Sequence, residues 1–156
     1  MTGSDRSAAE SRIRQLTAFY SDAINHHEPA RAASVYAPDG CLIAFDAPAL
    51  VGRDTIRAAI EATVSPLLFV HQMCHSGLIE VNGDRAIARW SVLEVIRRQE
   101  DDGLALFAGT YEDEIVSLEE GWRFSKRCLR MKARALLNLS KMKIFPEIAR
   151  ELELVI

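Results

Sequence analysis

Four residues of types suited to proton transfer or charge stabilisation stand in or beside apolar stretches of the chain. His71, His75 and Glu94 lie on either side of the dipeptide Asn82-Gly83, the strongest short signal for a β-hairpin turn. Tyr20 lies in a segment whose apolar residues recur at helical spacing. Burial raises the pKa of a carboxyl group and lowers that of an imidazole, which brings the two values closer together and favours proton transfer near neutral pH. Together these residues predict acid–base chemistry in a pocket.

The hairpin predicts which of these side chains share a face. If the Asn82-Gly83 turn has two central residues, His71 lies opposite Glu94. The same pairing sets His75 opposite Trp90, and all four side chains then point to one mainly apolar face. A histidine and a glutamate facing each other are interpreted in two ways. They form a structural pair inside a core, or they line a cavity that substrate enters.

A metal site is a further interpretation of His71 and His75, whose HxxxH spacing puts two ligands on one face of a helix. On an extended strand the two side chains lie about 13 Å apart, at ~3.3 Å per residue, too far to share an ion. The sequence also contains no Gly-rich phosphate loop and no GxSxG motif. We therefore expect neither a metal nor a cofactor.

Composition narrows the class of protein. The chain has 156 residues, 49% of them hydrophobic and 26% charged, which suits a single domain over residues 1–156. The net charge of −3 argues against a nucleic-acid partner, and the basic residues between 122 and 144 are matched by acids between 112 and 120. Apolar runs are too short for a membrane partner, and three cysteines without a CxxC pair suit reduced thiols in the cytoplasm.

The elements that position the candidate residues follow from hydrophobic periodicity. A first helix is predicted over residues 5–27, a short second one from Pro29 to Tyr36, and a third from Gly52 to just before Pro66. A short strand is predicted over 41–45, and long strands over 69–81, 85–98, 104–118 and 122–133. Helices followed by a meander of strands indicate an α+β fold with the helices on one face of an antiparallel sheet.

Three strings carry a resemblance to a known family: FYSDAINHHEPARAASVYAPDG, HSGLIEVNGDRAIARW and GTYEDEIVSLEEGWRF. They resemble the SnoaL-like branch of the nuclear transport factor 2-like superfamily, over about residues 10–131, with 134–156 as a C-terminal tail. The resemblance implies a cone-shaped, curved antiparallel sheet, a cystatin-like α+β barrel, wrapped by N-terminal helices around a pocket. This superfold hosts many functions, so the likeness favours a fold more than a reaction.

Within that group the local likeness is to scytalone dehydratase and bile-acid 7α-dehydratase, which implies catalytic roles for Tyr20, His75 and Glu94. Asn25 stands where those enzymes carry an acid, which is a departure from their pattern. Arg130 lies near an arginine of the bile-acid enzyme.

A second likeness is to ketosteroid isomerase. Tyr20 falls at the position of its oxyanion-hole tyrosine, and Asp46 lies two residues beyond the position of its general base. Asp46 is therefore a secondary candidate.

The function these features imply is that of a cofactor-independent lyase or isomerase acting on a cyclic, apolar small molecule such as a polyketide, steroid or terpenoid. His75 would remove a proton alpha to a carbonyl, Tyr20 would donate a hydrogen bond to the developing oxyanion, and Glu94 would tune the histidine or protonate a leaving group. The residues expected to contact substrate are Asn25, His71, Trp90, Arg130 and Asp46.

Two other functions remain open from the sequence: a non-catalytic small-molecule-binding protein, and the small subunit of a ring-hydroxylating oxygenase. The C-terminal string FPEIARELELVI ends in an apolar run. We expect it to cover the pocket mouth or to pack on a second copy in a homo-oligomer, a dimer or a trimer.

Overall fold

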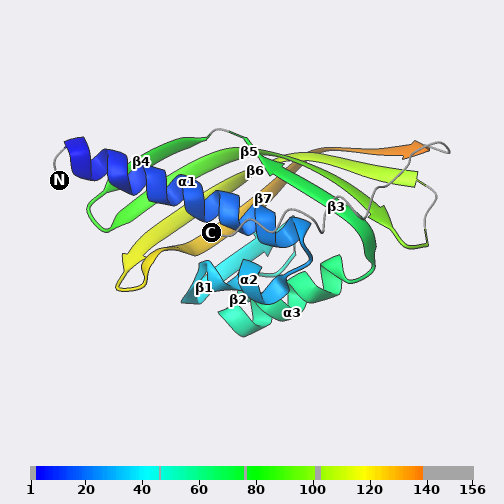
Figure 1. The fold of residues 1–156 in the computed structure, drawn as a ribbon, viewed down its shortest axis with the longest axis horizontal. Coiled ribbons are helices and arrows are strands. Elements are labelled where there is room, and N and C mark those ends of the chain that lie inside the picture. Colours follow the sequence, from blue (N-terminus) through cyan, green and yellow to red (C-terminus); the bar gives the residue numbers. More distant parts are fainter. Residues whose placement is uncertain (1–2, 46, 76, 101–102, 139–156) are drawn as a thin grey trace.

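The computed structural model describes residues 3–45, 47–75, 77–100 and 103–138. In chain order the elements are α1 (Gly3–Asn25), α2 (Pro29–Ser34), β1 (Tyr36–Ala44), β2 (Leu50–Val51), α3 (Arg53–Val64), β3 (Leu67–Cys74), β4 (Leu78–Asn82), β5 (Arg85–Arg98), β6 (Gly103–Leu118) and β7 (Gly121–Asn138). Helix α1 runs along the length of the sheet, and α2 and α3 lie together beside β1 and β2 (Figure 1). None of the helices in the described ranges has the length and apolar character needed to cross a bilayer.

The strands form one seven-stranded sheet in the order β2-β1-β7-β6-β5-β3, with β4 also paired to β5. The predicted α+β class, with a curved sheet and N-terminal helices, is confirmed. The expectation of a wholly antiparallel sheet is wrong at one place, because β1 runs parallel to β7. No tight turn joins these two strands, so nothing local dictates their relative direction. Strand β7 also continues to Asn138, beyond the predicted end at 133, and residues 139–156 lie outside the described part of the chain.

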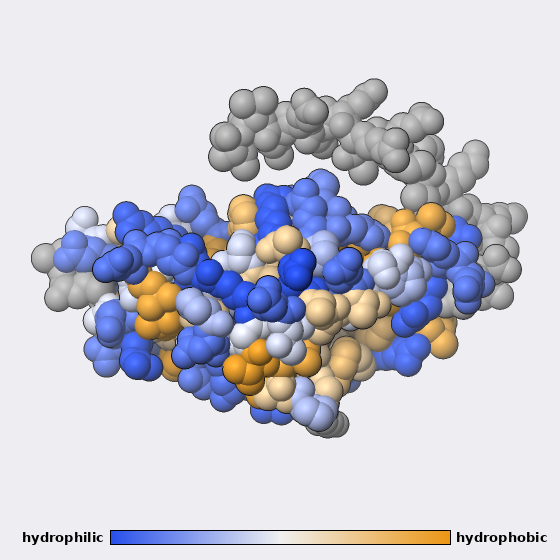
Figure 2. All heavy atoms as spheres, turned by 90° about the horizontal axis from the view of Figure 1, so that it is seen from below, coloured by the Kyte–Doolittle hydropathy of each residue, from blue (hydrophilic) through white to orange (hydrophobic). Residues whose placement is uncertain are grey.

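The helices bury the faces that their spacing predicts. Ile56, Ile60 and Val64 of α3 are all buried, as their separation by four residues requires. The surface seen from below Figure 1, on the side where α2 and α3 lie, is largely hydrophilic with scattered hydrophobic patches (Figure 2). Helix α1 ends at Asn25, two residues earlier than predicted, and His27 then takes a left-handed backbone conformation with φ of 56°. The α1 stripe still packs on the sheet.

The hairpin forms, but in a different register from the predicted one. Asn82 stays in the strand and pairs with Arg85, so the turn is centred on Gly83 and its neighbour Asp84. Gly83 has φ of 63°, a conformation that glycine adopts without strain. This shift of two residues keeps every side chain on its predicted face, and the even-numbered positions of β5 from Ala86 to Val92 are buried as expected.

The register of β3 against β5 differs by one residue from the register of β4 against β5. Leu78 pairs with Arg89, whereas Cys74 pairs with Val92. Three residues therefore oppose two between these pairs, which is the definition of a β-bulge. Gly77 is required there, because a Cβ atom would lie 2.4 Å from the Arg89 carbonyl oxygen and 2.5 Å from the Trp90 ring. A one-residue slip exchanges the two faces of a strand, so β3 turns the opposite face to the helices from the one predicted.

An ion pair between Arg127 and Asp113 lies in the centre of the core, with both side chains fully buried. Arg127 donates from Nε to Asp113 Oδ1 at 2.9 Å and from Nη2 to Oδ2 at 2.7 Å, and Trp90 Nε1 donates to Oδ2 at 2.9 Å. Burial would lower the pKa of Arg127, but the Asp113 carboxylate outweighs it and holds that pKa above its usual value. The guanidinium therefore stays charged inside the core.

Aromatic rings surround the same guanidinium. Its central carbon lies 3.8 Å from the ring centre of Phe124, 4.2 Å from that of Tyr111 and 4.6 Å from that of Tyr20. Arg127 Nη1 has no hydrogen-bond partner among the described residues. The aromatic rings stabilise the guanidinium through cation–π contacts. Strands β5, β6 and β7 and helix α1 all meet at this point.

Replacing Arg127 with methionine should lower the free energy of unfolding by about 3–5 kcal/mol, because Asp113 would be left as a buried charge without its cation. Denaturant unfolding followed by circular dichroism measures the change. The matched variant Arg130→Met removes an arginine from an exposed pair with Glu112 on the same two strands and should change stability little. Equal, small losses in both variants would contradict the central role of the buried pair.

Candidate active site

The concave side of the sheet holds two connected hollows, which we name the inner chamber, of about 160 Å³, and the outer chamber, of about 390 Å³. The inner chamber lies between α1, α3 and the sheet, and the outer chamber extends along β5, β6 and β7. Six residues line both: Phe45, Thr63, Gln72, Glu94, Tyr111 and Leu129. Most of the remaining lining is apolar, so a ligand that enters both chambers is removed from water over most of its surface.

Sheet register places one row of side chains across the boundary between the chambers. Gln72 of β3 pairs with Glu94 of β5, Glu94 with Phe107 of β6, and Phe107 with Arg134 of β7. Residues paired in this way project from the same face of the sheet. We call these four residues the cross-strand row, and all four line the outer chamber.

Glu94 is the carboxyl group in this row. Burial raises the pKa of Glu94, and a hydrogen bond from Gln72 Nε2 to Glu94 Oε2, at 2.7 Å, only partly offsets that rise. No ion pair to Glu94 is found in the described ranges. A carboxyl group with a raised pKa and no counter-charge is a stronger proton acceptor than a solvated one.

Two tyrosines share the inner chamber with Glu94. Burial raises the pKa of Tyr20, although the Arg127 charge opposes it, and burial raises the pKa of Tyr111 well above the ordinary value. Both hydroxyls therefore keep their protons at neutral pH. Gln72 Nε2 donates to the Tyr111 hydroxyl oxygen at 3.2 Å, and a side-chain hydrogen bond between Tyr111 and Tyr20 partly offsets the rise in the pKa of Tyr20. The two rings meet edge to face with centres 6.1 Å apart.

Gln72 is held in place from α1. Its side-chain carbonyl oxygen accepts a hydrogen bond from the Ser21 hydroxyl at 3.2 Å. The Asn25 side chain bonds the Gln72 backbone twice, accepting from its N–H at 2.6 Å and donating to its carbonyl oxygen at 3.0 Å. Asn25 thus occupies the hydrogen-bonding edge of β3 as a further strand would. An aspartate could not make both bonds, because a carboxylate has no donor.

The structure places the predicted site residues in three groups. Tyr20 and Glu94 line the inner chamber together, as the sequence led us to expect of a shared pocket. The predicted pairing of His71 with Glu94 is wrong, because Gln72 occupies that position and His71 pairs with Val95. His71 and His75 are both exposed and line neither chamber. The physical reason is the one-residue bulge after Cys74.

Asn25, Trp90 and Arg130 do not line the chambers either. Asn25 braces β3, and Trp90 is buried with its Nε1 on Asp113. Arg130 is exposed on the outer face of the sheet, where its Nε lies 3.4 Å from Glu112 Oε2. That pair, with Lys126 and Glu114 at 3.0 Å, confirms the predicted matching of acids and bases on the outer face. Asp46 lies outside the described residues.

Sequence reasoning missed Gln72 and Tyr111, which complete the polar part of the inner chamber. Tyr111 sits two residues from Asp113 and therefore on the same face of β6. Gln72 falls on the outward face of the strand in the predicted register, and the actual pairing with Glu94 turns it inward. Within the described ranges, no three His, Cys, Asp or Glu side chains come together in a way that would hold a metal ion.

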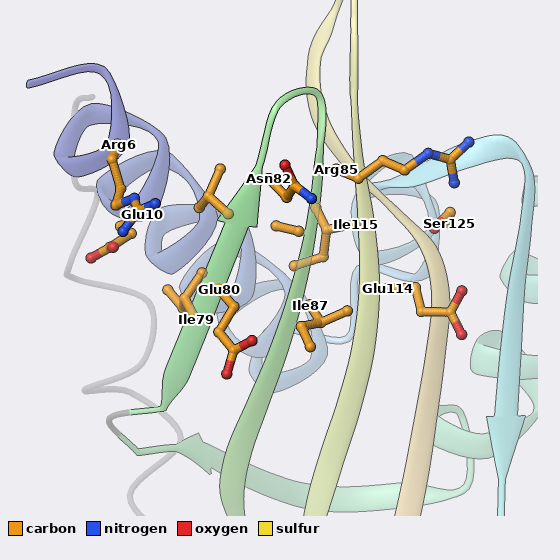
Figure 3. A pocket seen from close by; sticks show the side chains of 12 residues that line it. Arg6, Glu10, Ile79, Glu80, Asn82, Arg85, Ile87, Glu114, Ile115 and Ser125 are labelled. Carbon is orange, nitrogen blue, oxygen red and sulfur yellow. The ribbon is translucent and has the colours of Figure 1, made fainter. Parts of the chain in front are cut away.

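Two other hollows lie away from these residues. The larger, about 650 Å³, is at the hairpin end between the start of α1 and strands β4 to β6 (Figure 3). Arg6 and Glu10 lie on one side of it, and Arg85 and Glu114 on the other, so its charged groups do not converge. A second hollow, of about 500 Å³, is on the outer face and includes Arg130. The chambers remain the better candidate site because their polar groups converge in an apolar setting.

Comparison with known proteins identifies the family of the chain. The family model described as the SnoaL-like domain matches residues 5–128. No curated protein sequence matches the chain.

Solved structures match over most of their length. A candidate scytalone dehydratase from Novosphingobium aromaticivorans is 20% identical, with 90% of this chain and 99% of that chain covered and a TM-score of 0.78. The hexachlorocyclohexane dehydrochlorinase LinA-type3 from Novosphingobium barchaimii is 20% identical, covering 93% and 99%, with a TM-score of 0.81. An NTF2-like protein with a cystatin-like fold from Novosphingobium aromaticivorans is 17% identical, covering 81% and 84%, with a TM-score of 0.71. At these identities the likeness shows the fold.

The variant Asn25→Asp should destabilise the protein by about 1–3 kcal/mol, because it removes the donor to the Gln72 carbonyl and sets a carboxylate against it. Denaturant unfolding measures the loss. The same substitution at Asn82, an exposed strand-end residue, serves as the control and should have little effect. A stable Asn25→Asp protein would contradict the bracing role of Asn25.

The variant Glu94→Gln should be more stable than the parent at neutral pH. A carboxyl group whose pKa is raised by folding stabilises the folded state only while it is protonated, so its contribution is lost as pH rises above the unfolded value of about 4.3. The stability difference between the two proteins should therefore be small at pH 4 and grow towards pH 8. Denaturation at a series of pH values tests this. A difference independent of pH would show that Glu94 ionises normally.

Proposed function

The chain belongs to the SnoaL-like domain family, and we propose that it is a cofactor-independent lyase or isomerase acting on a cyclic, apolar small molecule such as a polyketide, steroid or terpenoid. The observation that carries the proposal is the position of Glu94. Its carboxyl group lies at the junction of two largely apolar chambers, with a raised pKa and with Gln72 as its hydrogen-bond donor. Such a group suits the removal of a proton from a carbon next to a carbonyl group.

Glu94 takes the role that the sequence analysis gave to His75. It accepts the proton from the substrate carbon, and the C–H bonding electrons move to form an enolate. The proton then returns to another carbon, which is an isomerisation. Alternatively the enolate expels a leaving group from the next carbon with its bonding electrons, which forms a double bond and completes an elimination. Gln72 steers the Glu94 carboxylate through the 2.7 Å hydrogen bond to Oε2.

Tyr20 and Tyr111 serve the developing oxyanion. Both line the inner chamber and both keep their protons because burial raises their pKa values. A fixed hydroxyl donor in a water-poor pocket stabilises negative charge more than it stabilises the neutral carbonyl. The Arg127 charge beneath both rings acts in the same direction by favouring negative charge near the hydroxyls.

One observation favours a second candidate, a non-catalytic binding protein with the same pocket. His75, which the sequence analysis expected to remove the proton, is exposed, as is His71, so the proposed chemistry rests on one carboxyl group. Such a protein would bind cyclic apolar ligands in the chambers without exchanging their protons. Binding and turnover therefore have to be measured on the same compounds.

The test is proton exchange on a simple cyclic ketone. Incubation of 1-tetralone with the protein in D₂O, followed by NMR, should show deuterium incorporation at the carbon next to the carbonyl. Glu94→Gln should slow this exchange by about 10²–10⁴-fold, because the proton acceptor is lost. In the parent protein the rate should rise with pH until Glu94 is fully ionised, and the midpoint should lie above the ordinary glutamate pKa.

Glu112→Gln is the matched control, since Glu112 is an exposed acid on the outer face of the sheet. It should leave the exchange rate unchanged. Exchange that is equally fast in Glu94→Gln would eliminate Glu94 as the base. Tight binding of 1-tetralone without any exchange would favour the binding protein instead.

A further inference from the structure

We propose that the outer chamber recognises an anionic group of the ligand through Arg134, assisted by Arg98, so that the substrate is an apolar ring system carrying a carboxylate or similar anion at one end. This inference rests on the proposed function for the identity of the reacting end. The inference adds that the ligand has a second, charged end, which lies at Arg134 while the reacting end lies at Glu94. Both arginines line the outer chamber.

Arg134 belongs to the cross-strand row that contains Glu94. Phe107 separates the two, one strand away from each. Because neighbouring strands lie about 4.8 Å apart, the backbones at Glu94 and Arg134 are about 10 Å apart. That span matches the long dimension of two fused six-membered rings with an acid substituent. A ring system lying along the cross-strand row would therefore come within reach of both side chains.

The Arg134 guanidinium is already oriented towards this position. Its central carbon lies 5.5 Å from the ring centre of Phe107, within cation–π range. Phe107 lines the same chamber, and its ring helps to position the guanidinium there. A planar guanidinium beside an aromatic ring suits bidentate recognition of a carboxylate on an aromatic or polycyclic ligand.

Neither arginine has a carboxylate partner in the described ranges, in contrast to several cations of β7. Arg127 pairs with Asp113, Arg130 with Glu112 and Lys126 with Glu114. Arg98 and Arg134 are both exposed, and both line the outer chamber. They are also too far from Glu94 to lower the pKa of its carboxyl group, which burial dominates. Two cations that line an apolar chamber and have no carboxylate partner among the described residues suit an anionic ligand.

Three kinds of polar group line the two chambers: tyrosine hydroxyls, one carboxyl group and two guanidinium groups. Tyr20 lines only the inner chamber, Tyr111 and Glu94 line both chambers, and the two arginines line only the outer chamber. A neutral ligand would leave the arginines without a partner, and an anion at the inner end would meet Glu94. The orientation of an acidic ligand is fixed by this order.

The experiment compares 2-naphthoate with 2-naphthamide, which share ring system and shape but differ in charge. Isothermal titration calorimetry at pH 7.5 and low salt should show that the parent protein binds the naphthoate about tenfold more tightly, the size expected for one charge-assisted contact. Arg134→Gln should remove most of this preference and leave naphthamide affinity unchanged. Raising the salt concentration should weaken the preference, because the contact is partly exposed.

Arg89→Gln is the matched control, since it removes an exposed arginine from the outer face of β5. It should leave the preference intact. Arg98→Gln should reduce the preference by a smaller factor than Arg134→Gln. Equal affinities for naphthoate and naphthamide in the parent, or an undiminished preference in Arg134→Gln, would overturn the inference.

Glu94→Gln separates this inference from the proposed function. It should retain, or slightly increase, the affinity for naphthoate while abolishing deuterium exchange on 1-tetralone. Retained exchange with a charge preference that depends on Arg134 would sink the proposed chemistry and leave the anion site standing. If Glu94→Gln loses exchange but the parent shows no charge preference, the proposed chemistry stands and the anion site is contradicted.

Discussion

The buried pair of Arg127 and Asp113 is the constraint on which the rest of this structure depends. A full charge inside a protein is tolerated only beside its partner and within hydrogen-bonding geometry, so these two residues cannot separate without a large cost. Because they sit on β6 and β7, and because Trp90 of β5 shares the same carboxylate, three strands are held in one register. The rings of Tyr20 and Tyr111 pack on the guanidinium, which ties α1 and the inner chamber to the same point.

Fold and site were accessible from the sequence to different degrees. Elements with strong periodicity were predicted well: the α3 stripe of Ile56, Ile60 and Val64 is buried as expected. The parallel pairing of β1 with β7 was not, since it joins segments with no turn between them. Helix spacing and strand alternation are local signals, whereas the partner of an edge strand is decided by the packing of the whole chain.

The candidate site shows the same limit at the level of single residues. Tyr20 and Glu94 were placed on the pocket side because the helical spacing of apolar residues in α1 and the alternation of side chains in β5 are both uninterrupted. His71 and His75 were misplaced because Gly77 admits a bulge, and a bulge leaves almost no sequence signal beyond a glycine inside a strand. Gln72 and Arg134 entered the site only through their pairing across the sheet, which a sequence does not display.

The extra residue between Cys74 and Leu78 has a consequence for comparisons within this family. Inserting or deleting one residue there would exchange the side chains that β3 offers to ligand for those it offers to solvent, while the strand itself stayed identical in sequence. Aligned residues in two homologues therefore share a role only when this connection has the same length in both. In a fold that hosts many reactions, a change in loop length supplies a new set of catalytic groups at once, without a single substitution in the strand.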